Sequence, residues 1–102
     1  MTYRIRLTDR AQADLNGIIN REIQDQIMSR INRLAQHPES GKVLRGILKG
    51  YRSVRAARNR YRIIYRVQDE EILVVIVMIG LRKGSDFGDV YKSFERFIKK
   101  EQ

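Results

Sequence analysis

Apolar and polar positions follow a period of two at the start of the chain and a helical period after it. In residues 3–7 apolar and basic side chains alternate, which predicts a first strand with one face in water. Apolar residues then recur every three or four positions, which predicts two amphipathic helices packed as an αα-hairpin. Thr8 is suited to cap the first helix, and Asn20 marks the break before the second. The expected apolar faces consist of Ala11, Leu15, Ile18 and Ile19, then Ile23, Ile27, Ile31 and Leu34.

Strands and one last helix are predicted beyond Pro38 and Gly41, which end the helical half. The final strand has no polar alternation, so we expect it to be central and covered on both faces. We expect Asp69-Glu70 to form the tight turn before it, and an apolar stripe over Asp89–Lys100 predicts the helix. The three strands are expected at residues 51–57, 61–68 and 72–79. This order indicates an α+β fold: N-terminal strand, αα-hairpin, antiparallel sheet of about four strands, C-terminal helix.

Composition narrows the class of protein. A length of 102 residues predicts one domain that spans 1–102. The chain has no cysteine and one histidine, so we expect no disulfide, no metal site and no other cofactor. The longest apolar run, residues 72–79, is too short to cross a bilayer, and the N-terminus has no apolar signal core. We therefore expect a cytoplasmic protein with no membrane partner.

The charge of the chain is strongly unbalanced, with a formal net charge of +9 that indicates an anionic partner. One segment, Lys42–Arg66, holds nine cations and no acidic residue. Arginine predominates there, which suits bidentate contacts to phosphate, although a solvated basic face with no specific role is the alternative. The nine cations are Lys42, Arg45, Lys49, Arg52, Arg55, Arg58, Arg60, Arg62 and Arg66.

Strand parity divides the tyrosines of this segment from its arginines. Alternate residues of a strand face opposite sides, so Arg62 and Arg66 share one face and Tyr61 and Tyr65 the other. The tyrosine face also carries Ile63 and Val67, so we expect it to pack on the helical hairpin. The tyrosines are then core residues, with base stacking as the alternative.

Several short motifs, taken in order, resemble the RelE/ParE superfamily of type II toxins, and in particular its RelE-like branch of mRNA interferases. They are Leu44-Arg45-Gly46, Gly50-Tyr51-Arg52, the strand Tyr61–Val67, Ile79-Gly80-Leu81-Arg82-Lys83 and Asp89-Val90-Tyr91. The likeness spans nearly the whole chain. It implies an endoribonuclease that cuts mRNA in the ribosomal A site, inhibits translation and is held in a hetero-oligomer by a cognate antitoxin.

The resemblance also implies roles for individual residues. Catalytic roles fall on Arg62, Arg82 and Tyr91, and on two basic residues placed two apart on the strand after Gly50-Tyr51. The last pair departs from the pattern: a forward count from Tyr51 gives Arg52 and Val54, whereas a backward count from Tyr61 gives Ser53 and Arg55. We carry over Arg52 and Arg55. The expected RNA-binding residues are Arg45, Lys49, Arg58, Arg60, Arg66 and Lys83.

The chemistry of RNA cleavage tests these assignments independently. The 2′-hydroxyl must lose a proton, and the charge of the phosphorane must be stabilised. Arginines serve the second need well and the first poorly, because a guanidinium does not deprotonate. Tyr91 is a candidate proton carrier, with base stacking or packing in the last helix as alternatives. For Arg82 the alternative is a surface cation. We expect Asp89 to cap the last helix and His37 to serve the last carbonyls of the second helix, with a catalytic role for His37 as the alternative.

Two other functions remain open at this level. A ParE-like inhibitor of DNA gyrase would share the fold and perform no chemistry, so the fold alone does not decide between the branches. A plain RNA-binding module would not need both Arg62 and Arg82 at strand ends. We favour the nuclease, whose partners would be the ribosome and mRNA.

Overall fold

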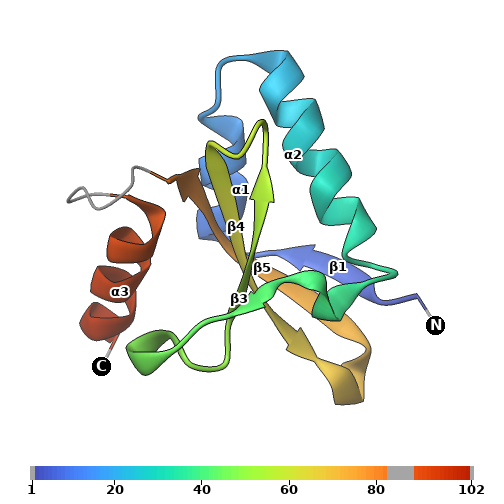
Figure 1. The fold of residues 1–102 in the computed structure, drawn as a ribbon, viewed down its shortest axis with the longest axis vertical. Helices are drawn as coiled ribbons and strands as arrows, with labels where there is room; N and C mark the ends of the chain where they lie inside the picture. The colour runs from blue at the N-terminus through green and yellow to red at the C-terminus, as the bar shows by residue number, and fades with distance from the viewer. Residues whose placement is uncertain (1, 83–88, 102) are drawn as a thin grey trace.

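The computed structural model describes residues 2–82 and 89–101. Within these residues, five strands and three helices follow one another (Figure 1). They are β1 (Arg4–Leu7), α1 (Asp9–Asn16), α2 (Arg21–Arg33), β2 (Lys42–Val43), β3 (Arg52–Ala56), β4 (Tyr61–Gln68), β5 (Leu73–Leu81) and α3 (Val90–Glu101). Short 3-10 turns occupy Pro38–Ser40, Gly46–Leu48 and Asp69–Glu71. The predicted α+β class is confirmed.

The strands form one sheet in the order β1-β5-β4-β3-β2. The pairs β5–β4, β4–β3 and β3–β2 are antiparallel, as predicted, but β1 runs parallel to β5. The helical hairpin and three other strands separate β1 from β5 in the chain, and β5 runs beside β1 in the same direction. As predicted, β5 is an interior strand whose residues Leu73–Ile76 are all buried.

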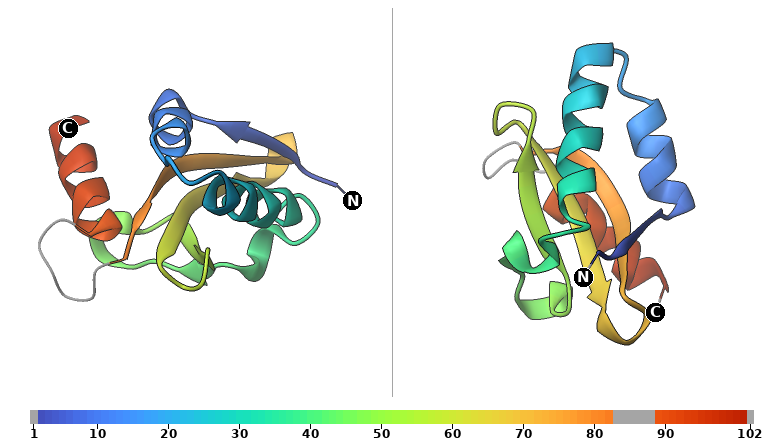
Figure 2. Two further views of the ribbon diagram at one scale, coloured as in Figure 1. Left: turned by 90° about the horizontal axis from the view of Figure 1, so that it is seen from above. Right: turned by 90° about the vertical axis from the view of Figure 1, so that its right-hand side faces the viewer.

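Each face of the sheet has its own apolar core. The helical hairpin covers one face, where Ile27 and Ile31 of α2 pack with Ile63 and Tyr65 of β4. On the other face α3 packs through Val90 and Phe94, against a separate cluster that includes Ile64. Figure 2 shows α1 and α2 together on one side of the sheet and α3 apart from them. Because α3 covers only part of its face, the strands beside it remain open.

The helix starts follow from their capping residues. The Thr8 hydroxyl accepts from the Ala11 N–H at 3.1 Å, as predicted. Asn20, which was expected only as a break between the helices, also caps the second one, because its amide oxygen accepts from the Ile23 N–H at 3.1 Å. The first helix is shorter than its apolar pattern suggested, because it ends at Asn16. The expectation that Ile19 belongs to its buried face is wrong, since Ile19 is fully exposed in the link between the helices.

The turn before β5 also differs from the prediction. Asp69–Glu71 forms a 3-10 turn instead of a two-residue hairpin, and Ile72 closes it in the left-handed conformation with φ 51°. The strand therefore begins at Leu73, one residue later than expected, and it continues to Leu81.

The parity predicted for β4 is confirmed. Tyr65 is fully buried on the hairpin side, where its hydroxyl donates to the Pro38 carbonyl at 2.7 Å and accepts from the Gly41 N–H at 2.8 Å. Burial raises the pKa of Tyr65. A side chain at position 41 would collide with this phenol ring, so glycine is required there. Arg62 and Arg66 lie on the opposite face, which the hairpin leaves uncovered.

Candidate functional site

Strand pairing brings basic side chains together on the open face. Arg55 of β3 stands directly opposite Arg62 of β4, and Lys42 of β2 stands opposite Ser53 of β3. Like charges placed opposite each other on a sheet destabilise it, so this arrangement has a cost that packing does not explain. These residues line an open cavity of about 410 Å³ with Leu44, Arg82 and Tyr91.

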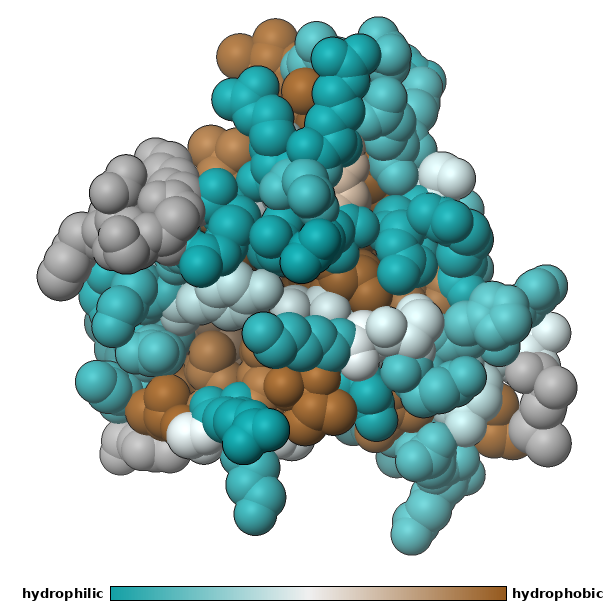
Figure 3. Space-filling model, in the orientation of Figure 1, coloured by the Kyte–Doolittle hydropathy of each residue, from teal (hydrophilic) through white to brown (hydrophobic). Residues whose placement is uncertain are grey.

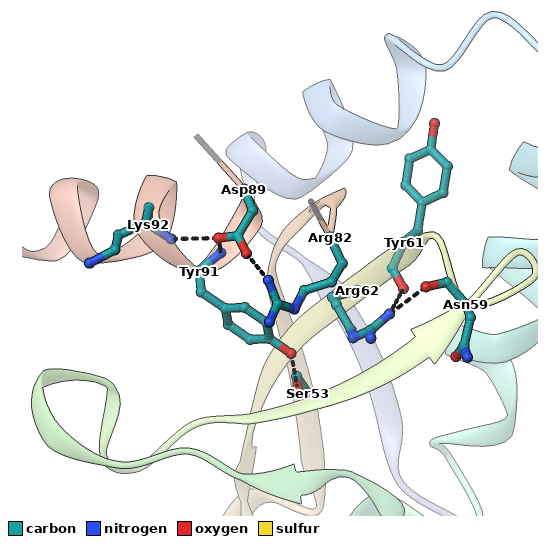
Figure 4. Close-up of polar contacts among 8 residues, drawn as sticks. All are labelled: Ser53, Asn59, Tyr61, Arg62, Arg82, Asp89, Tyr91 and Lys92. Atoms are coloured by element: carbon teal, nitrogen blue, oxygen red, sulfur yellow. Dashed lines mark hydrogen bonds and ion pairs between the residues drawn. The ribbon is translucent and has the colours of Figure 1, made fainter. Parts of the chain in front are cut away.

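Arg62 is fixed by the turn between β3 and β4 (Figure 4). Its Nη1 donates to the Asn59 carbonyl at 2.8 Å and to the Tyr61 carbonyl at 3.1 Å. That turn contains three consecutive left-handed residues, Ala57, Arg58 and Asn59. Only one nitrogen of Arg62 makes these bonds, so the guanidinium keeps further N–H donors for a ligand in the cavity.

Arg82 is held in the cavity by an ion pair with Asp89, a buried residue with 4% of its surface exposed. Asp89 Oδ2 pairs with Nη1 of Arg82, while Oδ1 accepts from the N–H groups of Tyr91 at 3.0 Å and Lys92 at 3.1 Å. Asp89 is therefore a helix cap, as predicted from the sequence. It is also the anchor of Arg82, so one buried carboxylate sets both the start of α3 and the position of a site cation.

Tyr91 points into the cavity from the first turn of α3. Its hydroxyl lies 2.8 Å from Ser53 Oγ, and the Arg82 guanidinium lies 5.4 Å from its ring centroid, within cation–π range (Figure 4). The ring also packs at the edge of the α3 cluster. The phenol thus has one apolar flank and one polar end inside the site.

The two counts for the basic pair lead to opposite faces of β3. Arg55 lines the cavity, whereas Arg52 lies on the hairpin side, where its Nη1 donates to the carbonyls of Glu39 at 3.2 Å and Gly41 at 3.0 Å. The backward count from Tyr61, which gives Ser53 and Arg55, therefore describes the site face. The two counts differ by one residue, and that additional residue belongs to the turn after β3.

The other expected RNA-binding residues are spread around the molecule. Arg45 and Lys49 are exposed beside the Gly46–Leu48 turn. Arg66 is exposed on the site face but lines a different hollow, with Phe94 and Phe97. Arg58 and Arg60 lie in the turn after β3, next to α2. Lys83 lies outside the described residues.

Three residues of the cavity had no site role predicted from the sequence. Lys42, Leu44 and Ser53 all line it. Lys42 reaches the site because β2, only two residues long, pairs with β3. A strand of two residues has no readable alternation, so no local signal could have placed Lys42 here. The backward count from Tyr61 gives Ser53 together with Arg55, so this count contains the signal for its place at the site.

The cavity is electropositive and open to solvent. Among residues 2–82 and 89–101, its lining includes four cations, Lys42, Arg55, Arg62 and Arg82, and no acidic residue. In the parts of the chain that the structure describes, no three histidine, cysteine or acidic side chains gather as a metal site would require. Within the same parts, no helix is both long and apolar enough to cross a membrane. The arrangement is suited to hold an anion and to stabilise negative charge.

Comparison with known proteins gives the class. Residues 5–84 match the model of the ParE toxin of the type II toxin–antitoxin system parDE. Toxin RelG of Mycobacterium tuberculosis is 33% identical over 93 residues, which are 90% of this chain and 99% of the relative. The fold matches the toxin–antitoxin complex RelBE2 of M. tuberculosis with a TM-score of 0.71 at 33% identity, over 80% of this chain and 100% of the other. It matches the intact Escherichia coli RelBE complex with a TM-score of 0.67 at 21% identity, over 80% and 99% of the two chains.

The protein is thus a toxin of a type II toxin–antitoxin system. The chain belongs to the RelE/ParE superfamily, through the ParE toxin family whose model spans most of its length.

Proposed function

We propose that this toxin is an endoribonuclease that cleaves mRNA in the ribosomal A site and so inhibits translation. The observation that supports this function best is the convergence of four cations and the Tyr91 hydroxyl on one open cavity. A surface that only contacts a protein partner does not need like charges held opposite each other on paired strands, as Arg55 and Arg62 are.

The cavity supplies most of what strand cleavage requires. When the 2′-oxygen attacks phosphorus, a P–O2′ bond forms, the P–O5′ bond breaks and the two non-bridging oxygens carry extra charge in between. Arg55, Arg62 and Arg82 are placed to stabilise that charge by hydrogen bonding. The proton of the 2′-hydroxyl and the proton needed by the 5′-oxygen require titratable groups, and in the described part of the lining these are Lys42 and Tyr91.

The proposed partners follow from the same reasoning. Two of the matched structures are complexes with a second protein, the RelBE2 and RelBE toxin–antitoxin complexes. We expect this toxin to form such a hetero-oligomer with its own antitoxin. Its targets would be the ribosome and mRNA, which places its action in the cytoplasm.

A second candidate is an inhibitor of DNA gyrase that performs no chemistry. The match to the parDE toxin family favours it. Under this hypothesis the cavity would have no role in toxicity, and side chains elsewhere on the surface would contact the target.

Brief expression in bacteria separates the two functions. The nuclease predicts translation arrest within minutes and mRNA cut inside codons, mapped by primer extension. The gyrase inhibitor predicts DNA-damage signalling with intact mRNA. Arg62→Ala should abolish mRNA cutting, whereas Arg6→Ala, an exposed arginine on β1 at the other edge of the sheet, should leave it unchanged.

A further inference from the structure

A second group of arginines lines a groove on the hairpin side of the molecule. The groove has a volume of about 570 Å³ and runs between α2 and the end of β3 with its following turn. Figures 1 and 2 show the tip of the β3–β4 hairpin beside α2, and Figure 3 shows hydrophilic side chains gathered over this region. Four arginines line the groove: Arg30, Arg33, Arg55 and Arg58.

These four guanidinium groups are not neutralised within the structure. Among residues 2–82 and 89–101, none of them forms an ion pair with a carboxylate. Arg30 and Arg33 lie one turn apart near the C-terminal end of α2. Partial burial lowers the pKa of Arg30, and the positive charge of the neighbouring Arg33 lowers it further.

Acidic residues lie at the other end of the groove. Glu22 and Asp25 line it from the first turns of α2, and Asp25 is already paired with Arg21 at 3.4 Å. Glu22 and Arg33 are eleven residues apart on the helix, a rise of roughly 16 Å. The basic part of the groove is therefore the part formed by Arg30, Arg33 and Arg55.

Arg55 connects this groove to the cavity on the opposite face, because it lines both. The pairing of β2 reaches only Arg52 and Ser53 of β3, so residues 54–56 form an open edge of the sheet. A flexible polyanion bound in the cavity could pass around that edge at Arg55 and continue into the groove.

We propose that the groove between α2 and β3 is a second binding site for the phosphodiester backbone of RNA, continuous with the cleavage cavity through Arg55. This inference rests on the proposed function in that RNA is the ligand of both sites. Guanidinium groups recognise phosphate and carboxylate alike. RNA is favoured over an acidic peptide because one ligand with a charge on every unit serves the groove and the cavity together. The negative charge of Glu22 repels phosphate and so limits how far the RNA strand extends along α2.

The test compares two double variants with equal net charge. Arg30→Gln/Arg33→Gln removes two charges from the groove, and Arg4→Gln/Arg6→Gln removes two from β1 at the far edge of the sheet. Affinity for a 20-nucleotide 2′-O-methyl RNA, which cannot be cleaved through its 2′-oxygen, is measured over a range of salt concentrations. Circular dichroism checks that both variants are folded, and Arg33→Gln alone provides a milder change at an exposed position.

The groove variant should bind about 3–10-fold more weakly than the β1 variant, and its slope of log affinity against log salt should fall by about 1.4, roughly 0.7 for each charge removed. In ribosome-dependent cleavage it should raise KM and leave kcat unchanged. An equal loss of RNA affinity in the two double variants would overturn the proposal that the groove binds RNA. So would stronger competition by polyglutamate than by RNA at equal charge, because it would assign the groove to an acidic protein.

The proposal and the proposed function can fail separately. A wild-type toxin that binds the RNA through the groove but never cuts mRNA contradicts the nuclease and keeps the groove. A wild-type toxin that cuts mRNA, with a groove variant that binds RNA as well as wild type does, contradicts the groove and keeps the nuclease.

Discussion

The hydroxyl groups of Ser53 and Tyr91 lie 2.8 Å apart and connect the middle of β3 to the first turn of α3. Ser53 is buried, with 5% of its surface exposed, so its hydroxyl has few other partners available. The bond fixes the phenol end of a side chain whose ring already lies beside the Arg82 guanidinium. Ser53 is therefore positioned to orient Tyr91 in the cavity.

Ser53→Ala should lower the rate of mRNA cleavage several-fold with little effect on folding. A single neutral hydrogen bond stabilises a fold by about 0.5–1.5 kcal/mol, so the variant should remain folded at assay temperature. Single-turnover cleavage on ribosomes and urea unfolding measure the two effects. In a Tyr91→Phe background the serine change should have no further effect on the rate, and an additive loss would contradict the positioning role.

The ion pair between Arg82 and Asp89 leads to a different prediction, because Asp89, the acidic partner of Arg82, is buried. Arg82→Ala should abolish cleavage and also destabilise the protein by about 1–3 kcal/mol, since it leaves a buried carboxylate without its partner. A surface cation with no buried partner, the alternative for Arg82 at the level of sequence, would show no such loss. Thermal and urea unfolding of the purified variant check it.

The double variant Arg82→Ala/Asp89→Asn separates the two roles. The asparagine side chain would be neutral, and its amide oxygen could still cap α3 in place of the Asp89 Oδ1. Stability should recover and cleavage should not. Recovery of cleavage along with stability would show that Arg82 acts only through the fold.

The sequence predicted those features whose signals are local. Thr8 and Asn20 start helices because a short polar side chain caps free N–H groups, and the parity of β4 follows from its own alternation. The parallel pairing of β1 with β5 joins residues nearly seventy positions apart, so no window of sequence reveals it. The face of β3 was ambiguous because the turn after it contains three left-handed residues and no glycine to mark its length.

Arg52 and Arg55 decide whether that face is assigned correctly. Arg55→Ala should reduce cleavage by at least tenfold and leave stability unchanged or slightly higher, because it removes a like charge opposite Arg62. Arg52→Ala should leave the chemical step intact and destabilise the protein by about 1 kcal/mol, because it removes donors to the Glu39 and Gly41 carbonyls. Cleavage rate and unfolding free energy are measured for both variants. The reverse pattern would favour the forward count from Tyr51.

Lys42 provides the sharpest test of the chemistry. It stands opposite Ser53 and lines the cavity with three arginines, none of which can release a proton. If Lys42 transfers a proton, Lys42→Arg should be as slow in single-turnover cleavage as Lys42→Met, about 100-fold below wild type, although it keeps the charge. If Lys42 only attracts the phosphate, Lys42→Arg should cleave nearly as fast as wild type, and Tyr91 would be left as the titratable group of the lining. Lys99→Met, an exposed lysine in the last turn of α3 and outside the cavity, is the control, and it should cleave at the wild-type rate.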